Sequence, residues 1–140
     1  MKTTFKLTFL CAAIIVATLA GCKKYPEGPG LTVLSKKTRL AGDWKLDKEL
    51  VNGVEQSLSG TTTTLKIEKS GSYTYTSTGT GYSITDAGKW EFIDKKDDLK
   101  TTSNVAGATA DTAVILKLKS KELWVIDKTG TFKTESHYKQ

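Results

Sequence analysis

From Leu40 onward the sequence is a series of short segments in which apolar and polar residues alternate, with turn-forming residues between them. Residues 72–78 alternate tyrosine with threonine, and residues 112–119 alternate aliphatic with mostly polar residues. Asn52-Gly53 is a strong hairpin signal, and no segment shows a sustained helical period. Strands spaced roughly 8–12 residues apart predict an all-β, antiparallel domain of about eight to ten strands.

Two architectures fit this pattern. An up-and-down meander that closes into a small β-barrel is favoured, because closure removes the sheet edges that would otherwise invite aggregation. A β-sandwich is the alternative. Frequent threonine, tyrosine and tryptophan suit either of them, because these residues favour strands.

The N-terminus has the pattern of an export signal. Lys2 and Lys6 are followed by an apolar run over residues 7–20. This run is shorter than the roughly 20 residues of a membrane-spanning helix, which indicates a removable signal rather than an anchor. Leu19-Ala20-Gly21-Cys22 resembles a bacterial lipobox. The resemblance implies cleavage before Cys22 and a lipid on its sulfur; an ordinary secretory signal with a stray cysteine is the alternative.

The expected organisation therefore has three parts: a lipoprotein signal peptide at 1–21, a lipidated tether at 22–38 and a β-domain at 39–140. The tether contains both prolines of the chain. Near its end, a short helical turn is one structure that could close one end of the β-domain. Lys23 is not the aspartate associated with inner-membrane retention. By that resemblance we expect a cell-envelope protein held at the outer membrane, on an undetermined face.

Cysteine and histidine usage argues against catalysis. Cys11 leaves with the signal and Cys22 is expected to carry lipid, so the domain has no disulfide, thiolate nucleophile or cysteine metal site. The single histidine, His137, has no second histidine to pair with. We therefore expect no enzyme, no metal and no cofactor. The net charge of +6 is spread along the chain rather than clustered, so nucleic acid is not an expected partner.

Several runs resemble one family. Gly42-Asp43-Trp44 is similar to the Gly-x-Trp opening strand of lipocalins, and residues 22–29 and 88–92 are similar to lipocalin-like lipoproteins of the Bacteroidota. The resemblance implies a lipocalin-like small β-barrel that binds a small hydrophobic ligand. One departure is that the only arginine, Arg39, precedes the first strand, whereas lipocalins place an arginine near the last strand, across the tryptophan.

Aromatic residues recur on successive expected strands and offer a ligand pocket. The alternative interpretation is an ordinary filled core, since hollow and filled barrels share the same alternation. If the barrel binds a ligand, tyrosine hydroxyls and tryptophan N–H groups would orient it. The expected lining residues are Tyr73, Tyr75, Trp90, Phe92, Leu116 and Trp124. The alternative function is a non-enzymatic interaction domain in an envelope assembly, using the threonine-rich stretches 61–64 and 74–80.

Overall fold

The computed structural model of the protein describes residues 33–127 and 130–140. Cys22, the expected signal peptide and most of the expected tether lie outside these residues. The described elements are α2 (Lys36–Leu40), β1 (Gly42–Val51), β2 (Val54–Glu55), β3 (Thr62–Ile67), β4 (Ser72–Gly79), β5 (Tyr82–Ile93), the 3-10 turn η2 (Asp94–Lys96), β6 (Asp98–Ser103), β7 (Ala110–Leu118), β8 (Glu122–Asp127) and β9 (Thr134–Lys139).

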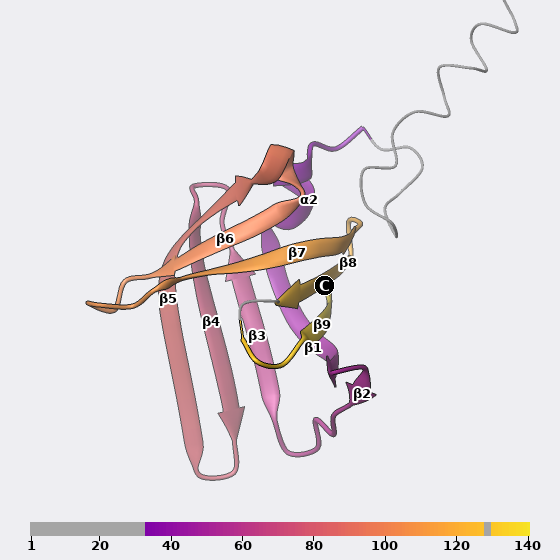
Figure 1. Ribbon diagram of the computed structural model, residues 1–140, viewed down its shortest axis with the longest axis vertical. Helices are drawn as coiled ribbons and strands as arrows, with labels where there is room; N and C mark the ends of the chain where they lie inside the picture. The colour runs from indigo at the N-terminus through magenta and orange to yellow at the C-terminus, as the bar shows by residue number, and fades with distance from the viewer. Residues whose placement is uncertain (1–32, 128–129) are drawn as a thin grey trace, which may run out of the picture.

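The sheet is a closed antiparallel barrel. Strands β3 to β9 follow one another in chain order, β1 pairs with β3, and β9 pairs back with β1 to close the ring (Figure 1). The ring contains eight strands, and the two-residue β2 is an addition to the end of β1. The expected all-β, up-and-down, lipocalin-like small barrel is therefore confirmed over the sandwich.

One end of the barrel is closed by α2 (Figure 1). Ser35 caps this helix by accepting a hydrogen bond from the Thr38 N–H at 3.1 Å. Leu40 is fully buried, and its carbonyl accepts a hydrogen bond from the indole N–H of Trp44 at 2.8 Å. The guanidinium of Arg39 donates to the Leu118 carbonyl at 2.6 Å. The helix thus joins the first strand to the end of β7.

The core extends from this closed end along the inner face of the strands. Along β3 and the first half of β1 its residues alternate with exposed ones, as a barrel with one buried face requires. The buried apolar residues are Leu40, Trp44, Ile67, Tyr73, Trp90, Leu99, Ile115, Leu118, Leu123 and Tyr138. Leu46, Leu65, Tyr75, Phe92 and Val125 pack against them and are partly buried.

Asp86-Ala87-Gly88 has the residue types of a turn, but strand β5 passes through these residues without turning. It is one continuous strand of 12 residues. Two contacts explain this continuity. The Asp86 carboxylate accepts hydrogen bonds from neighbouring strands, and Gly88 lies where a side chain would overlap the Thr102 carbonyl and the Tyr73 ring. Asp86 and Gly88 therefore lie within a continuous strand, at positions where neighbouring strands approach closely.

Candidate functional site

The polar centre of the inner face is a carboxylate held by three strands. Asp86 of β5 accepts a hydrogen bond from the Tyr73 hydroxyl of β4 at 2.5 Å and from the Ser103 hydroxyl of β6 at 2.5 Å. In the strand pairing, Tyr73 of β4 lies opposite Gly88 of β5, and Gly88 lies opposite Ser103 of β6. The two hydroxyl-bearing residues therefore flank the strand that carries Asp86. Hydrogen bonds to a charged acceptor are stronger than neutral ones. The group therefore orders the inner surface between β4 and β6.

These contacts shift the acidity of both partners. The hydrogen bonds from Ser103 and then Tyr73 hold the pKa of Asp86 below its usual value of 3.8. The pKa of Tyr73 is raised well above its usual value of 10.0, first by burial and then by the hydrogen bond to Asp86. The negative charge of Asp111 also raises it. Near neutral pH, the centre therefore contains a carboxylate and neutral hydroxyls.

A second buried tyrosine, Tyr138, lies on the inner face of β9. Burial, together with smaller contributions from Tyr75 and Glu49, raises the pKa of Tyr138 to about 12, and a hydrogen bond with Ser136 opposes this change. Tyr75 of β4 and Glu49 of β1 therefore act on the same region of the interior. The register shift between Leu46 and Lys48 in the β1–β9 pairing places Glu49 opposite Ser136, on the same face as Tyr138.

The acidic side chains that act on the inner tyrosines differ from the other carboxylates in their charge partners. Three carboxylates, those of Glu49, Asp86 and Asp111, act on inner tyrosines. Within the described residues, no ion pair with a lysine or arginine involves any of them. Lysines instead form ion pairs with carboxylates outside this group. These pairs are Lys36–Asp97, Lys48–Glu55, Lys66–Glu68, Lys100–Glu91, Lys117–Glu122, Lys119–Glu122 and Lys139–Asp47.

Four of the six residues expected to line a pocket share this inner surface. Tyr73 and Trp90 are buried, and Tyr75 and Phe92 are partly buried against the core. The rings of Trp90 and Phe92 pack edge to face, with centroids 5.3 Å apart. The indole N–H of Trp90 donates to the Glu68 carbonyl at 2.9 Å, so it is already occupied. Trp90 therefore forms part of the floor, whereas Tyr75 and Phe92 are more accessible.

The other two expected residues lie elsewhere. Leu116 lies at the register shift between Ile115 and Lys117 in the β7–β8 pairing. Trp124 alternates with the core residues Leu123 and Val125, so it lies on the outer face of β8. Its ring stacks on His137 with centroids 4.0 Å apart and planes 2° apart. The structure therefore does not bring Trp124 together with the inner aromatics.

Trp124 is the centre of an outer-face array. The Lys117 ammonium lies 3.9 Å from the centroid of the Trp124 ring and 3.3 Å from a Glu122 oxygen. On the other side of the ring, His137 lies 2.6 Å from a Glu135 oxygen. The chain's single histidine is thus engaged in a packed, hydrogen-bonded contact. Among residues 33–127 and 130–140, no group of three or more histidine, cysteine or acidic side chains is arranged to hold a metal ion.

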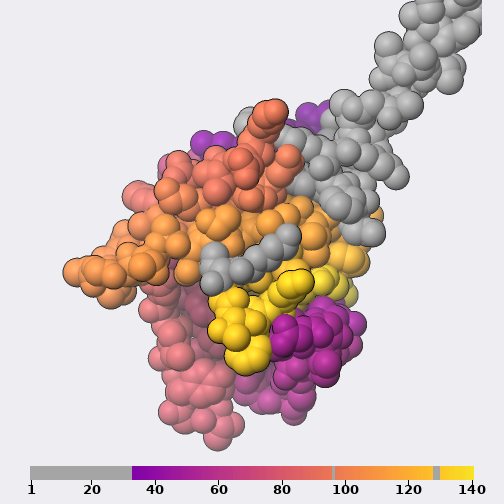
Figure 2. Space-filling view, in the orientation of Figure 1, coloured from indigo at the N-terminus to yellow at the C-terminus, as the bar shows by residue number. Residues whose placement is uncertain are grey.

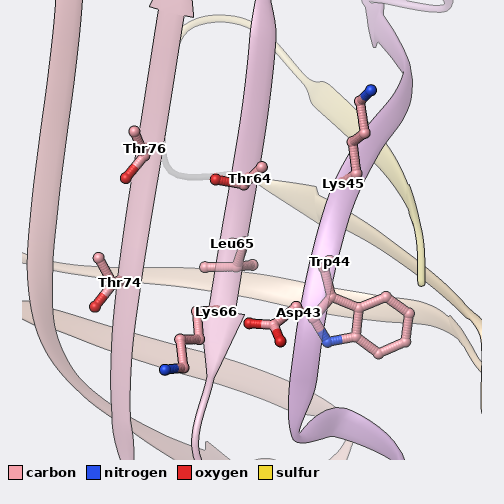
Figure 3. Close-up of a pocket in the computed structure, with 8 residues that line it drawn as sticks. All are labelled: Asp43, Trp44, Lys45, Thr64, Leu65, Lys66, Thr74 and Thr76. Atoms are coloured by element: carbon pink, nitrogen blue, oxygen red, sulfur yellow. The ribbon is translucent and has the colours of Figure 1, made fainter.

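Concave surfaces also occur outside the barrel. A groove of about 570 Å³ crosses β1, β3 and β4 (Figure 3). Its lining residues are Asp43, Trp44, Lys45, Thr64, Leu65, Lys66, Thr74 and Thr76. The threonines and lysines alternate with inward-facing residues, so the groove is a polar outer face. It includes part of the threonine-rich surface expected from the sequence. A second hollow, of about 390 Å³, lies over Gly71, Lys89 and Lys100.

Comparison with models of known protein families gives no match, and comparison with curated proteins gives none either. In the part of the chain that the structure describes, no helix is both long and apolar enough to cross a membrane.

Proposed function

We propose that this protein is a lipid-anchored, lipocalin-like protein of the cell envelope that binds a small hydrophobic ligand inside its barrel. The observation that carries the proposal is the arrangement on the inner face: the partly buried ring of Tyr75 lies opposite Asp86 of the Tyr73–Asp86–Ser103 centre, and Phe92 packs against Trp90 farther along β5. Ligand pockets typically combine an apolar lining with a few placed polar groups. The envelope localisation in this proposal rests on the export-signal pattern and on Cys22 as the lipidated residue.

The charge of the interior narrows the class of ligand. The carboxylates of Glu49, Asp86 and the exposed Asp111 all act on inner tyrosines, and they would repel an anion bound on this part of the inner face. A neutral or cationic ligand with an apolar body therefore fits better than a fatty acid. An amine or hydroxyl on such a ligand would donate hydrogen bonds to the carboxylates or the tyrosine oxygens.

Native mass spectrometry of a soluble form comprising residues 25–140, purified without detergent, tests the binding proposal. We expect an added mass that disappears on denaturation. Titration with a fluorescent apolar amine and with a fatty acid of equal chain length then tests the charge preference, and we expect the amine to bind at least tenfold more tightly. Equal or tighter binding of the fatty acid would contradict the ligand class.

Two substitutions locate the site. Tyr75→Ala removes an inner ring beside the polar centre and is expected to weaken amine binding by tenfold or more. Trp124→Ala is the matched control, because it removes an aromatic ring from the outer face and should leave binding unchanged. If both variants lose binding equally, a site inside the barrel is not supported.

The anchor is tested separately from the barrel. Cys22→Ala should move the protein from the membrane fraction to the soluble fraction, because no sulfur remains to carry lipid. A Cys22→Ala protein that stays bound to membranes through a carbonate wash would contradict lipid anchoring. This outcome would leave the ligand proposal standing.

A second candidate is an interaction domain, and the 570 Å³ outer groove favours it. Lys45 and Lys66 line this groove together with three threonines, which gives a polar surface suited to hydrogen bonding with a partner. Thr76→Arg would fill part of the groove without entering the core. Loss of a co-purifying partner with Thr76→Arg, together with unchanged ligand binding, would favour this function over the first.

A further inference from the structure

Strand β5 is paired along its whole length on one edge but only along half of it on the other. It pairs with β4 from Tyr82 to Lys89 and with β6 only from Gly88 to Ile93. In Figure 1 the lower half of β5 forms the outer margin of the β3–β4–β5 sheet, and β6 crosses only its upper half. Figure 2 shows the β4–β5 hairpin as a separate lobe beside the β6–β7 loop. Residues 82–86 therefore form an open edge within the described chain.

The direction of the backbone groups on this edge follows from two hydrogen bonds. The Ala87 carbonyl accepts from the Asn104 N–H at 2.8 Å on the β6 side, and the Trp90 N–H donates to the Gly71 carbonyl at 2.8 Å on the opposite side. Because successive residues in an antiparallel strand direct these groups to alternate edges, Ser83 and Thr85 point theirs toward the open edge. Each presents one donor and one acceptor there.

The open edge lacks two of the features that usually protect a strand edge, and the carboxylate of its one charged residue, Asp86, is engaged by Tyr73 and Ser103. Residues 82–87 contain no lysine and no proline, although both residues are common protections against edge-to-edge association. Two large side chains on the segment are exposed, Tyr82 by 44% and Ile84 by 58%. The edge of strand β2, by contrast, has such protection: the strand is only two residues long, and its Glu55 forms an ion pair with Lys48 at 2.7 Å.

We propose that two copies of this protein pair antiparallel along this edge, about a twofold axis at Ile84. In this register Ile84 lies opposite the partner's Ile84, and Ser83 lies opposite the partner's Thr85. The two Ser83–Thr85 pairs exchange four backbone hydrogen bonds. The result is a symmetric interface made from the same segment of each copy. It joins the two β3–β4–β5 sheets into one continuous sheet.

The segment is complementary to itself in this register, which favours a second copy as the occupant. The apolar Ile84 side chains meet each other, and Asp86 lies opposite the partner's Tyr82 rather than opposite another carboxylate. An axis at Asp86 would place two carboxylates against each other and would require the edge of Gly88, which β6 already occupies. An axis at Tyr82 would leave Thr85 without a strand residue opposite it.

Cross-linking tests the register directly. Residues opposite each other in a non-hydrogen-bonded pair have Cα atoms about 4.5 Å apart, which a disulfide can bridge. Ile84→Cys in the full chain should therefore give a disulfide-linked dimer under mild oxidation. Tyr82→Cys is the matched control on the same strand and face. Its two copies would lie about 13 Å apart along the strands, so we expect at least tenfold less dimer. The wild-type chain controls for Cys11 and Cys22.

A second substitution tests the backbone hydrogen bonds. In the Ile84→Cys protein, Thr85→Pro removes the edge N–H without removing a bond to β4, and it should lower dimer formation at least fivefold. Thr85→Ala keeps the N–H and should leave dimer formation unchanged. Circular dichroism verifies that each variant is folded. Equal cross-linking of Ile84→Cys and Tyr82→Cys, no cross-linking of either, or no effect of Thr85→Pro would overturn the proposal.

Discussion

Asp86 links three strands through one side chain, and this makes its ionisation part of the stability of the barrel. Its two hydroxyl donors, Tyr73 and Ser103, favour the charged form. We expect Asp86→Asn to lower the free energy of unfolding at neutral pH by about 1–3 kcal/mol, because hydrogen bonds to a charged acceptor are lost. Urea denaturation measures this change.

The same carboxylate predicts an acid dependence with a definite sign. The pKa of Asp86 is lower in the folded state than its usual value of 3.8, so its stabilisation is complete above about that pH and is lost as the pH falls through the lower, folded-state value. Stability of the wild-type protein should therefore fall more steeply below pH 3.8 than that of Asp86→Asn. Parallel acid profiles for the two proteins would contradict this role.

The two buried tyrosines predict a dependence at high pH. Burial raises the folded-state pKa of Tyr138 to about 12 and that of Tyr73 well above 10.0. Because the folded state holds these protons more tightly than the unfolded state, stability is complete below pH 10.0 and falls as the pH rises through the folded-state values. Ultraviolet titration of Tyr73→Phe and Tyr138→Phe should each show one late-titrating tyrosine fewer. Unchanged titration curves would contradict the assignment.

Gly88 is required by close packing rather than by backbone freedom. An added Cβ would overlap the Thr102 carbonyl and meet the Tyr73 ring, so Gly88→Ala forces the β5–β6 contact apart. We expect a loss of about 1–3 kcal/mol, as for other overpacked positions. Gly130→Ala is the control, since its Cβ would meet only the Phe132 backbone at 3.7 Å or more. Thermal denaturation should separate the two variants.

At the scale of elements, α2 fastens the closed end through one buried cation. Arg39 is only 7% exposed and donates to the Leu118 carbonyl at 2.6 Å. Arg39→Met keeps the apolar stem but leaves that carbonyl without its donor, which should cost about 1–3 kcal/mol. Lys37→Met on the exposed face of the same helix should change stability by less than about 0.5 kcal/mol. Equal effects in denaturant melts would show that the hydrogen bond contributes little.

The strands that could be predicted were those with clear alternation and clear turns. Tyrosines and threonines alternate in β4, and Asn52-Gly53 forms the expected turn after β1. The continuity of β5 could not be predicted, because Asp86 and Gly88 resemble turn residues until their contacts with β4 and β6 are known. Strand β8 carries apolar residues on both faces, so alternation alone could not show that Trp124 faces outward.

The inner site was only partly predictable for the same reason. Tyr73, Tyr75, Trp90 and Phe92 share strand parity with neighbouring core residues, and the structure brings them together. The acidic partners were missed, because Asp86 and Glu49 belong to the inner face only through pairings between strands distant in sequence. A register shift in β1 places Glu49 inward, and nothing in the local sequence marks that shift.

At the scale of the whole molecule, the ring depends on β9, which pairs with β8 on one edge and β1 on the other. Ser136 lies in both pairings, opposite Val125 and Glu49. A proline there removes a ladder hydrogen bond from a strand that is paired on both edges, a position where proline is essentially not found. It also frees two strand edges for association. We therefore expect Ser136→Pro to lower stability strongly and to aggregate on mild heating.

Thr85→Pro is the matched control, because it places the same residue on the open edge of β5, where no described neighbour uses its N–H. It should cost less than about 1 kcal/mol, since proline is tolerated on strand edges. Denaturant melts and light scattering on both variants measure the difference. If the two prolines destabilise the protein equally, then either β5 is not an open edge or the β1–β9 closure contributes little to stability. Dimer formation by the Thr85→Pro, Ile84→Cys protein distinguishes these two explanations.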